Sequence, residues 1–119
     1  METKSSIAYL RFLGLSNALT GQTVSPLSAN QRALLEAIAL AWHSGQPMSV
    51  RQAISLSSLG SPATLHKRLG VLRTEGYLHE AHVLGNKRTK WLGPTPKALK
   101  FFEMLSAAMD TARETQAPT

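Results

Sequence analysis

The segment from residue 61 to residue 92 constrains the fold of this chain more than any other part. Its first residues predict a well-defined helix, because Ser61 is a favourable N-cap and Pro62 suits the first turn, where its missing N–H is no loss. Helical spacing places three leucines on one face: Leu65, Leu69 and Leu72. The sequence therefore predicts a capped helix with a buried leucine face and an outward face of small and basic residues.

The residues after this helix predict a strand and a hairpin. Gly76 is a typical helix stop, and Tyr77 to Val83 is rich in the β-branched and aromatic residues that strands favour. Gly85-Asn86 is a strong hairpin turn signal, and Thr89 to Leu92 supplies the return strand. The two strands would form a wing, which is a β-hairpin beside the helix.

A second, shorter helix is expected just before residue 61. Ser49 and Gln52 stand at capping-box spacing, which predicts a helix from Ser49 to about Leu56. Ser57 to Gly60 then forms a tight turn, in which Leu59 is the apolar residue that can pack on the core. Two helices joined in this way form a helix-turn-helix, a unit that DNA-binding and protein-interaction domains share.

Longer helices flank this unit. Ser28 and Gln31 form another capping box, and the apolar residues that follow predict the first core helix: Leu34, Leu35, Ile38, Ala41 and Trp42. We expect Trp42 to be a core anchor. The segments 5–19 and 95–114 predict two helices with more apolar surface than one domain can bury. These two helices are therefore expected to pack against a second copy in a two-fold dimer.

The expected architecture is mainly α with a small β-hairpin, a winged helix-turn-helix with flanking N- and C-terminal helices. Residues 1–26 would form an N-terminal helix and a linker from Gly21 to Pro26, and residues 27–94 the winged helix-turn-helix. Residues 95–119 would form a C-terminal helix with a frayed tail, and both terminal segments would dimerise. With 119 residues, 43% of them hydrophobic, the chain is large enough for a single core.

The positive charge of the chain is unevenly distributed. The formal net charge is +6, but nine Lys and Arg between Gly45 and Phe102 stand against Glu75 and Glu80, a net charge of +7. The remainder of the chain carries −1. A surface that binds a polyanion needs such a concentration of charge, so double-stranded DNA is the expected partner.

Other classes of function have little support. The chain has no cysteine, which excludes disulfides and fits a cytoplasmic protein. No stretch approaches the roughly 18 apolar residues of a membrane span, and Arg11 interrupts the N-terminal apolar run, so neither a membrane nor a signal peptide is expected. His79 and His82 would face opposite sides of a strand, which makes a poor metal pair. Without a carboxylate pair or a phosphate loop, we expect no enzyme activity, no metal and no cofactor.

From Leu27 to about Glu103 the chain resembles the MarR-type winged helix-turn-helix transcriptional regulators. The resemblance rests on the helix at 61–72, on Glu75-Gly76-Tyr77-Leu78, on the wing Arg88 and on Thr95-Pro96-Lys97. It implies a dimeric DNA-binding protein.

The sequence departs from the family pattern in three places. Family wings commonly have aspartate where this chain has Asn86, and the Thr-Pro-Lys motif is usually flanked by leucine and glycine where this chain has Pro94 and Ala98. Family members usually have two helices after the wing, and this chain has room for one.

These features predict a DNA-binding site. Thr64, His66 and Lys67 are expected to enter the major groove, with Lys67 contacting guanine and with Ser61 and Ala63 near the phosphates. The remaining expected contacts lie on the same helix and on the wing: Arg68, Gly70, Arg73, Lys87, Arg88 and Lys90. Glycine would let DNA come close to the helix, and wing cations with no acidic residue nearby could reach phosphates or a minor groove.

Two functions of different classes remain open. The first is a dimeric, sequence-specific transcriptional regulator. The second is a winged helix used as a protein-interaction or assembly module, including a partner in DNA replication or segregation. For each feature there is also an interpretation without a binding role. The outward helix face could be a solvated surface, and the wing could be a loop kept soluble by its charge. The charge asymmetry favours the regulator. A small-molecule effector also stays open as a partner.

Overall fold

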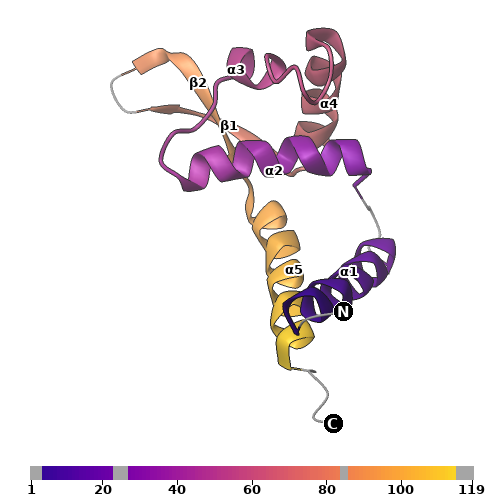
Figure 1. Ribbon diagram of the computed structural model, residues 1–119. Coiled ribbons are helices and arrows are strands. Elements are labelled where there is room, and N and C mark those ends of the chain that lie inside the picture. Colours follow the sequence, from indigo (N-terminus) through magenta and orange to yellow (C-terminus); the bar gives the residue numbers. More distant parts are fainter. Residues whose placement is uncertain (1–3, 23–26, 84–85, 115–119) are drawn as a thin grey trace. The chain divides into compact units, whose positions relative to one another are not determined.

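The computed structural model describes residues 4–22, 27–83 and 86–114. In these ranges the elements follow in the order α1 (Lys4–Gln22), α2 (Ala29–His43), α3 (Val50–Ile54), α4 (Pro62–Thr74), β1 (Leu78–Val83), β2 (Asn86–Pro94) and α5 (Pro96–Glu114) (Figure 1). The prediction of a mainly α winged helix-turn-helix with one small hairpin and flanking helices is confirmed.

The chain divides into two compact units. We call Leu27–Leu99 the winged-helix unit, and Met1–Pro26 together with Lys100–Thr119 the terminal-helix unit. The helix α5 begins in the first unit and continues in the second. None of the helices in the described ranges combines the length and the hydropathy that crossing a membrane requires.

The core of the winged-helix unit lies between α2 and α4. The largest fully buried side chains on these two helices are the ones that helical spacing predicts: Leu34, Leu35, Ile38, Leu65, Leu69 and Leu72. The helix α2 packs on α4 and on β2, and α3 packs on α4. Each buried leucine or isoleucine stabilises the fold by roughly 1.5–3 kcal/mol, so this leucine face fixes which side of α4 points outward.

The prediction that Trp42 anchors the core is wrong. Its side chain is 44% exposed at the end of α2. The indole ring instead covers the hairpin, because a Cβ atom added to Gly93 would come within 3.3 Å of Trp42 Cδ1 and of His79 Nε2. Helical spacing places Trp42 on the apolar face, but at this turn the helix meets a glycine on a strand rather than the core.

Both predicted capping boxes are present. The Ser28 hydroxyl accepts the Gln31 N–H at 3.1 Å while the Gln31 side chain accepts the Ser28 N–H at 3.0 Å. Ser49 and Gln52 form the same pair of bonds, at 3.2 and 2.9 Å. The helix α3 ends at Ile54, two residues before the predicted end, because the chain turns there through further backbone hydrogen bonds.

The glycine stop after α4 is confirmed in detail. Glu75 is the C-cap, and Gly76 follows it with φ +85°, a conformation that side chains disfavour. The Gly76 N–H donates to the Arg73 carbonyl at 3.0 Å, and the Tyr77 N–H donates to the Leu72 carbonyl at 2.8 Å. This pair of bonds is a Schellman motif, and it ends the helix at a defined residue.

The wing is an antiparallel hairpin of β1 and β2. Its pairing runs from Leu78 opposite Pro94 to His82 opposite Lys90, and an irregularity follows before Val83 pairs with Asn86. The prediction that Asn86 belongs to the turn is therefore wrong, because it is part of the strand, while Gly85 lies outside the described residues. Because pairing already begins at Asn86, β2 is longer than the predicted return strand from Thr89 to Leu92.

The segment before α3 also joins the wing. The Leu92 N–H donates to the Met48 carbonyl at 2.8 Å, and Ser49 forms an isolated bridge with Trp91. These bonds hold the start of α3 against β2.

The two long helices lie at the ends of the chain. The helix α1 continues to Gln22, so Gly21 is helical and not part of a linker as predicted, and residues 23–26 lie outside the described residues. Thr95 caps α5, because its hydroxyl accepts the Ala98 N–H at 3.2 Å. One face of α5 is buried, at helical spacing: Ala98, Phe101, Leu105, Ala108 and Ala112.

Candidate nucleic-acid interface

The outward face of α4 has no packing partner within the described part of the chain. Ala63, His66 and Lys67 are exposed. A Cβ atom added to Gly70 would meet no atom within 4 Å, apart from the helix's own backbone and the neighbouring residues. Because the leucine face is buried, the exposed residues of this opposite face are available to a partner molecule.

Ser61 and Thr64 have a structural task at the start of α4. The Ser61 hydroxyl accepts the Thr64 N–H at 3.2 Å and donates its own proton to the Thr64 hydroxyl at 2.9 Å. Both side chains are exposed, and the Thr64 hydroxyl keeps its own proton for donation. Thr64 can therefore hydrogen-bond an external acceptor without breaking the cap.

Arg68 is placed differently from the other predicted site residues. Its Nη1 donates to the Leu59 carbonyl at 2.9 Å, so the half-buried side chain folds back over the turn between α3 and α4. A Cβ atom added to Gly60 would come within 3.4 Å of the same nitrogen. Arg68 therefore holds the helix-turn-helix turn, through a bond that links residues nine positions apart and has no local sequence signal.

Arg73 and Lys90 share one carboxylate. Arg73 Nη1 donates to Glu80 Oε1, and Lys90 Nζ lies 3.7 Å from Glu80 Oε2. The prediction that no acidic residue lies near the wing cations is thus wrong for Lys90. The cause is the hairpin register, since Glu80 faces Leu92 and Lys90 lies two residues further along the same face of β2.

The other two wing cations, Lys87 and Arg88, belong to β2 by their backbone. Their side chains lie outside the described residues, so their predicted contact with DNA stays a prediction.

The start of α5 is bonded to the end of α4. Lys97 Nζ donates to the Glu75 carbonyl at 2.7 Å and lies 4.6 Å from the centroid of the Tyr77 ring. The Thr95 hydroxyl donates to the Gly76 carbonyl. Burial, and secondarily the charge of Glu75, raises the pKa of Tyr77 above its ordinary value. The resemblance singles out Thr95-Pro96-Lys97, and the geometry adds that the side chains of Thr95 and Lys97 close the carbonyl end of α4.

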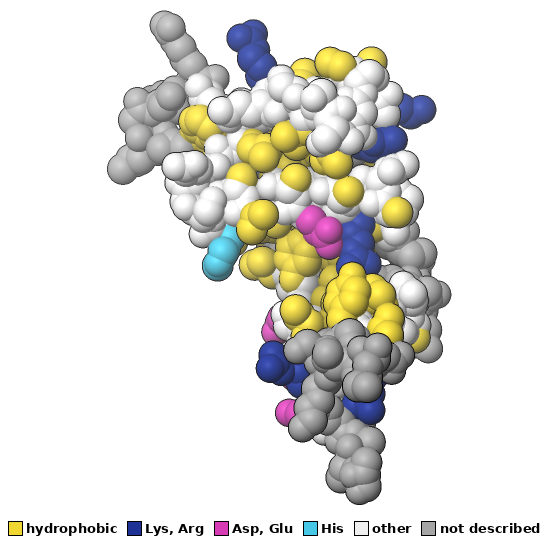
Figure 2. All heavy atoms as spheres, in the orientation of Figure 1, with side chains coloured by type: hydrophobic (Ala, Val, Ile, Leu, Met, Phe, Trp, Pro, Cys, Tyr) yellow, Lys and Arg dark blue, Asp and Glu magenta, His cyan; other side chains and the backbone are white. Residues whose placement is uncertain are grey.

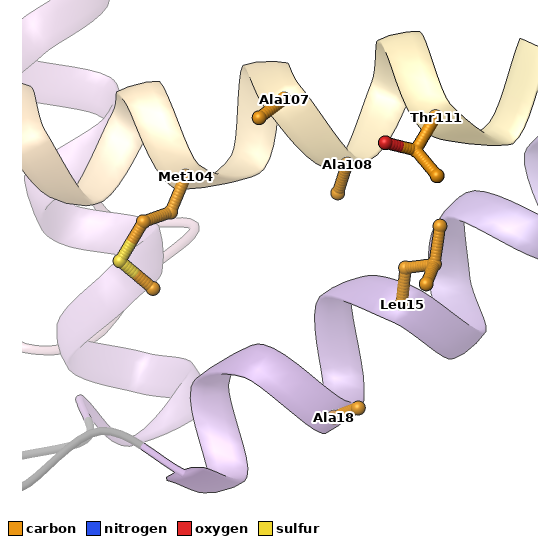
Figure 3. A pocket seen from close by; sticks show the side chains of 6 residues that line it. All are labelled: Leu15, Ala18, Met104, Ala107, Ala108 and Thr111. Carbon is orange, nitrogen blue, oxygen red and sulfur yellow. The ribbon is translucent and has the colours of Figure 1, made fainter. Parts of the chain in front are cut away.

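The terminal-helix unit contains an apolar hollow of about 330 Å³. Figure 3 shows the side chains around it, which come from α1 and α5: Leu15, Ala18, Met104, Ala107, Ala108 and Thr111. Most of them are small, and Thr111 alone among these six has a polar side chain. A bulky apolar group is the kind of occupant that such a lining fits.

Hydrophobic side chains also reach the surface, as the yellow spheres in Figure 2 show. Among the described residues, the large ones that are most exposed are Tyr9, Leu10, Leu40, Trp42, Leu99 and Met109. In the same described ranges, no three His, Asp or Glu side chains come together in a way that could hold a metal ion.

Comparison with known proteins identifies the fold of the chain. No known family model matches the chain, and no curated protein matches it. Solved structures do match its fold. Staphylococcus aureus MarR in complex with salicylate and kanamycin is 21% identical with a TM-score of 0.58, and the match covers 89% of this chain and 66% of MarR.

Two structures of S. aureus MepR also match. MepR bound to ethidium bromide is 14% identical with a TM-score of 0.68, over 90% of this chain and 73% of MepR. The MepR–DNA complex is 14% identical with a TM-score of 0.60, over 91% of this chain and 81% of MepR. This chain therefore has the winged-helix fold of MarR-type regulators, and it spans about two thirds of the length of MarR.

Proposed function

We propose that this protein is a sequence-specific DNA-binding transcriptional regulator that acts as a dimer. In this proposal α4 lies in the major groove, and the wing lies on the minor groove or on phosphates. The observation that carries the proposal is the outward face of α4, where Ala63, His66 and Lys67 are exposed and a Cβ atom added to Gly70 would meet open space. An α-helix fits the major groove, and its small and polar side chains can reach base edges there.

The electrostatics support the same partner. The positive charge is concentrated between Gly45 and Phe102, a range that contains α4 and the wing. Counterion release from DNA then favours binding, in proportion to the number of phosphates that the cations neutralise. The likeness to the MepR–DNA complex also supports this partner, because that protein uses the same fold on DNA.

The terminal-helix unit supports dimerisation. Tyr9, Leu10 and Met109 are more than half exposed, and an apolar hollow lies on the same unit. A second copy that covers these side chains would remove them from water. A small-molecule effector with an apolar part is another occupant that the hollow would fit, and the matching MarR structure holds two small molecules, salicylate and kanamycin.

The function is tested by selecting bound sequences from random double-stranded DNA at a stated salt concentration, with wild-type protein and Lys67→Ala. Because Lys67 would contact a base, the variant should lose roughly 1–3 kcal/mol on the selected site and accept other bases at one position. Lys100→Ala is the matched control, since it removes the same charge from an exposed position on α5. It should leave the base preference unchanged.

Two results would count against the proposal. If Lys67→Ala kept the wild-type base preference, α4 would not be the element that reads DNA. If the wild-type protein showed little affinity for DNA at any salt concentration, the winged helix would be a protein-interaction or assembly module instead.

A further inference from the structure

A second polar feature lies beside the wing, and it includes Lys90 of the predicted DNA-binding site. It is a hollow of about 520 Å³ in the winged-helix unit. Ser49, Val50 and Arg51 line it from the start of α3, and Thr89 and Lys90 line it from β2. We call it the Arg51 hollow.

The two walls of the Arg51 hollow are held together by the backbone. Ser49 forms a bridge with Trp91, and the Leu92 N–H donates to the Met48 carbonyl at 2.8 Å. The hollow therefore exists before any partner arrives, so binding there requires little ordering of the chain.

The charges around the Arg51 hollow are unbalanced. Arg51 and Lys90 are both exposed, and none of the lining residues is acidic. Among the described residues Arg51 forms no ion pair. The ion pair of Lys90 in the same residues is a long one, with 3.7 Å between Lys90 Nζ and Glu80 Oε2. Two cations that line one hollow repel each other, and an anion between them would relieve that repulsion.

The donors around the hollow suit a phosphate in particular. A guanidinium binds phosphate oxygens through two parallel hydrogen bonds, and an ammonium adds a point charge. Ser49 adds a hydroxyl group to the same lining; its oxygen accepts the Gln52 N–H, and its own proton can be donated to a phosphate. A volume of about 520 Å³ lies in the range of sites that hold ligands larger than a single phosphate, so the sugars next to it also fit.

We propose that the Arg51 hollow binds a phosphate group of the DNA backbone, with Arg51 and Lys90 on either side of it. This inference rests on the proposed function, since it takes DNA as the source of the phosphate. A backbone contact of this kind fixes the position of the protein on the duplex and carries no base information. Arg51 is thus a DNA-binding residue that the sequence analysis did not include.

The experiment compares Arg51→Gln with wild-type protein in DNA titrations over a range of salt concentrations. Loss of a charged phosphate contact should weaken binding roughly tenfold for each subunit of the dimer, equally for specific and non-specific DNA. Because each subunit of the proposed dimer loses one contact, the log–log slope of affinity against salt should become shallower by about 1.8, and the base preference should stay the same. Arg51→Lys should keep the wild-type slope, because it keeps the charge.

Arg113→Gln is the matched control, because it removes the same charge from an exposed position in the terminal-helix unit. Unlike Arg51→Gln, it should leave both the DNA affinity and the salt slope unchanged. Circular dichroism and thermal melting of each variant show that it is folded. If wild-type protein binds DNA and the two glutamine variants behave alike, the Arg51 hollow holds no DNA phosphate, while the proposed function stands. If wild-type protein does not bind DNA, the proposed function itself fails.

A parallel titration with inorganic phosphate separates the two possible sources of the anion. Chemical shifts of the Arg51 and Thr89 amides report occupation of the hollow. Phosphate binding that depends on Arg51, combined with DNA affinity that does not, would overturn the assignment to DNA and identify a site for free phosphate. Competition between phosphate and DNA that Arg51→Gln abolishes would support the proposal.

Discussion

Gly70 has the clearest mismatch between its chemistry and its position. It lies inside α4, where glycine costs roughly 1 kcal/mol relative to alanine, and a Cβ atom there would meet nothing within 4 Å. Gly70→Ala should therefore stabilise the free protein by about 0.5–1 kcal/mol and raise the midpoint of thermal unfolding by a few degrees. If DNA approaches this face closely, the added methyl group should weaken DNA binding at the same time.

Gly14 supplies the control, because it is also helical and also has open space around its Cβ position. Gly14→Ala should raise the unfolding midpoint and leave DNA affinity unchanged. Equal DNA affinity for both alanine variants would contradict close approach of DNA at Gly70.

Individual residues also show where sequence patterns stop being informative. The roles of Ser61 and Gly76 could be predicted, because caps and stops depend on neighbours within a few positions. The partners of Arg68 and Lys90 could not, since one bond crosses a turn and the other depends on the strand register. The prediction that Trp42 anchors the core was wrong for the same reason, because the residue that faces its ring is a glycine on the distant strand β2.

At the scale of elements, the junction between α4 and α5 makes its own prediction. Lys97 joins the two helices through the Glu75 carbonyl and the Tyr77 ring. Lys97→Met keeps the apolar stem and removes the charged donor, so it should lower the free energy of unfolding by about 1 kcal/mol. Urea unfolding measures this change, and faster hydrogen exchange at the Tyr77 amide would show that the end of α4 has loosened.

Lys100→Met is the appropriate comparison, because Lys100 is exposed one turn further along α5. It should have little effect on unfolding. An equal loss in both variants would mean that the bond to Glu75 contributes nothing measurable.

The boundaries of helices and strands were also predictable where neighbouring residues determine them, and not where distant residues do. The leucine face of α4 and the capping boxes of α2 and α3 were predictable from spacing alone. The position of the hairpin turn was not, because strand pairing takes Asn86 into β2. The same holds for the end of α1, which continues through Gly21 although glycine is a weak helix former.

At the scale of the whole molecule, the exposed apolar residues predict an oligomer. We expect a two-fold dimer through the terminal-helix unit, because its surface carries Tyr9, Leu10 and Met109. Light scattering at micromolar concentration should give the mass of a dimer, and Met109→Glu should shift it toward the monomer. Leu40→Glu, which changes an exposed leucine in the winged-helix unit, should leave the mass unchanged.

A clean monomer of the wild-type protein would contradict this prediction. It would also remove the expectation of a palindromic operator, since two-fold symmetric sites reflect two-fold symmetric proteins.

The two faces of α4 have a consequence for how this protein can change over time. The leucines that hold the helix in place and the residues that point outward are different sets, so selection can act on each set separately. Substitutions at Ala63, His66 and Lys67 remove no core contact, and surface changes of this kind usually alter stability by less than about 0.5 kcal/mol. A lineage of such proteins can therefore move from one target sequence to another through folded ancestors at every step. Variation of the same three positions would give a small library of folded variants from which new DNA specificities can be selected.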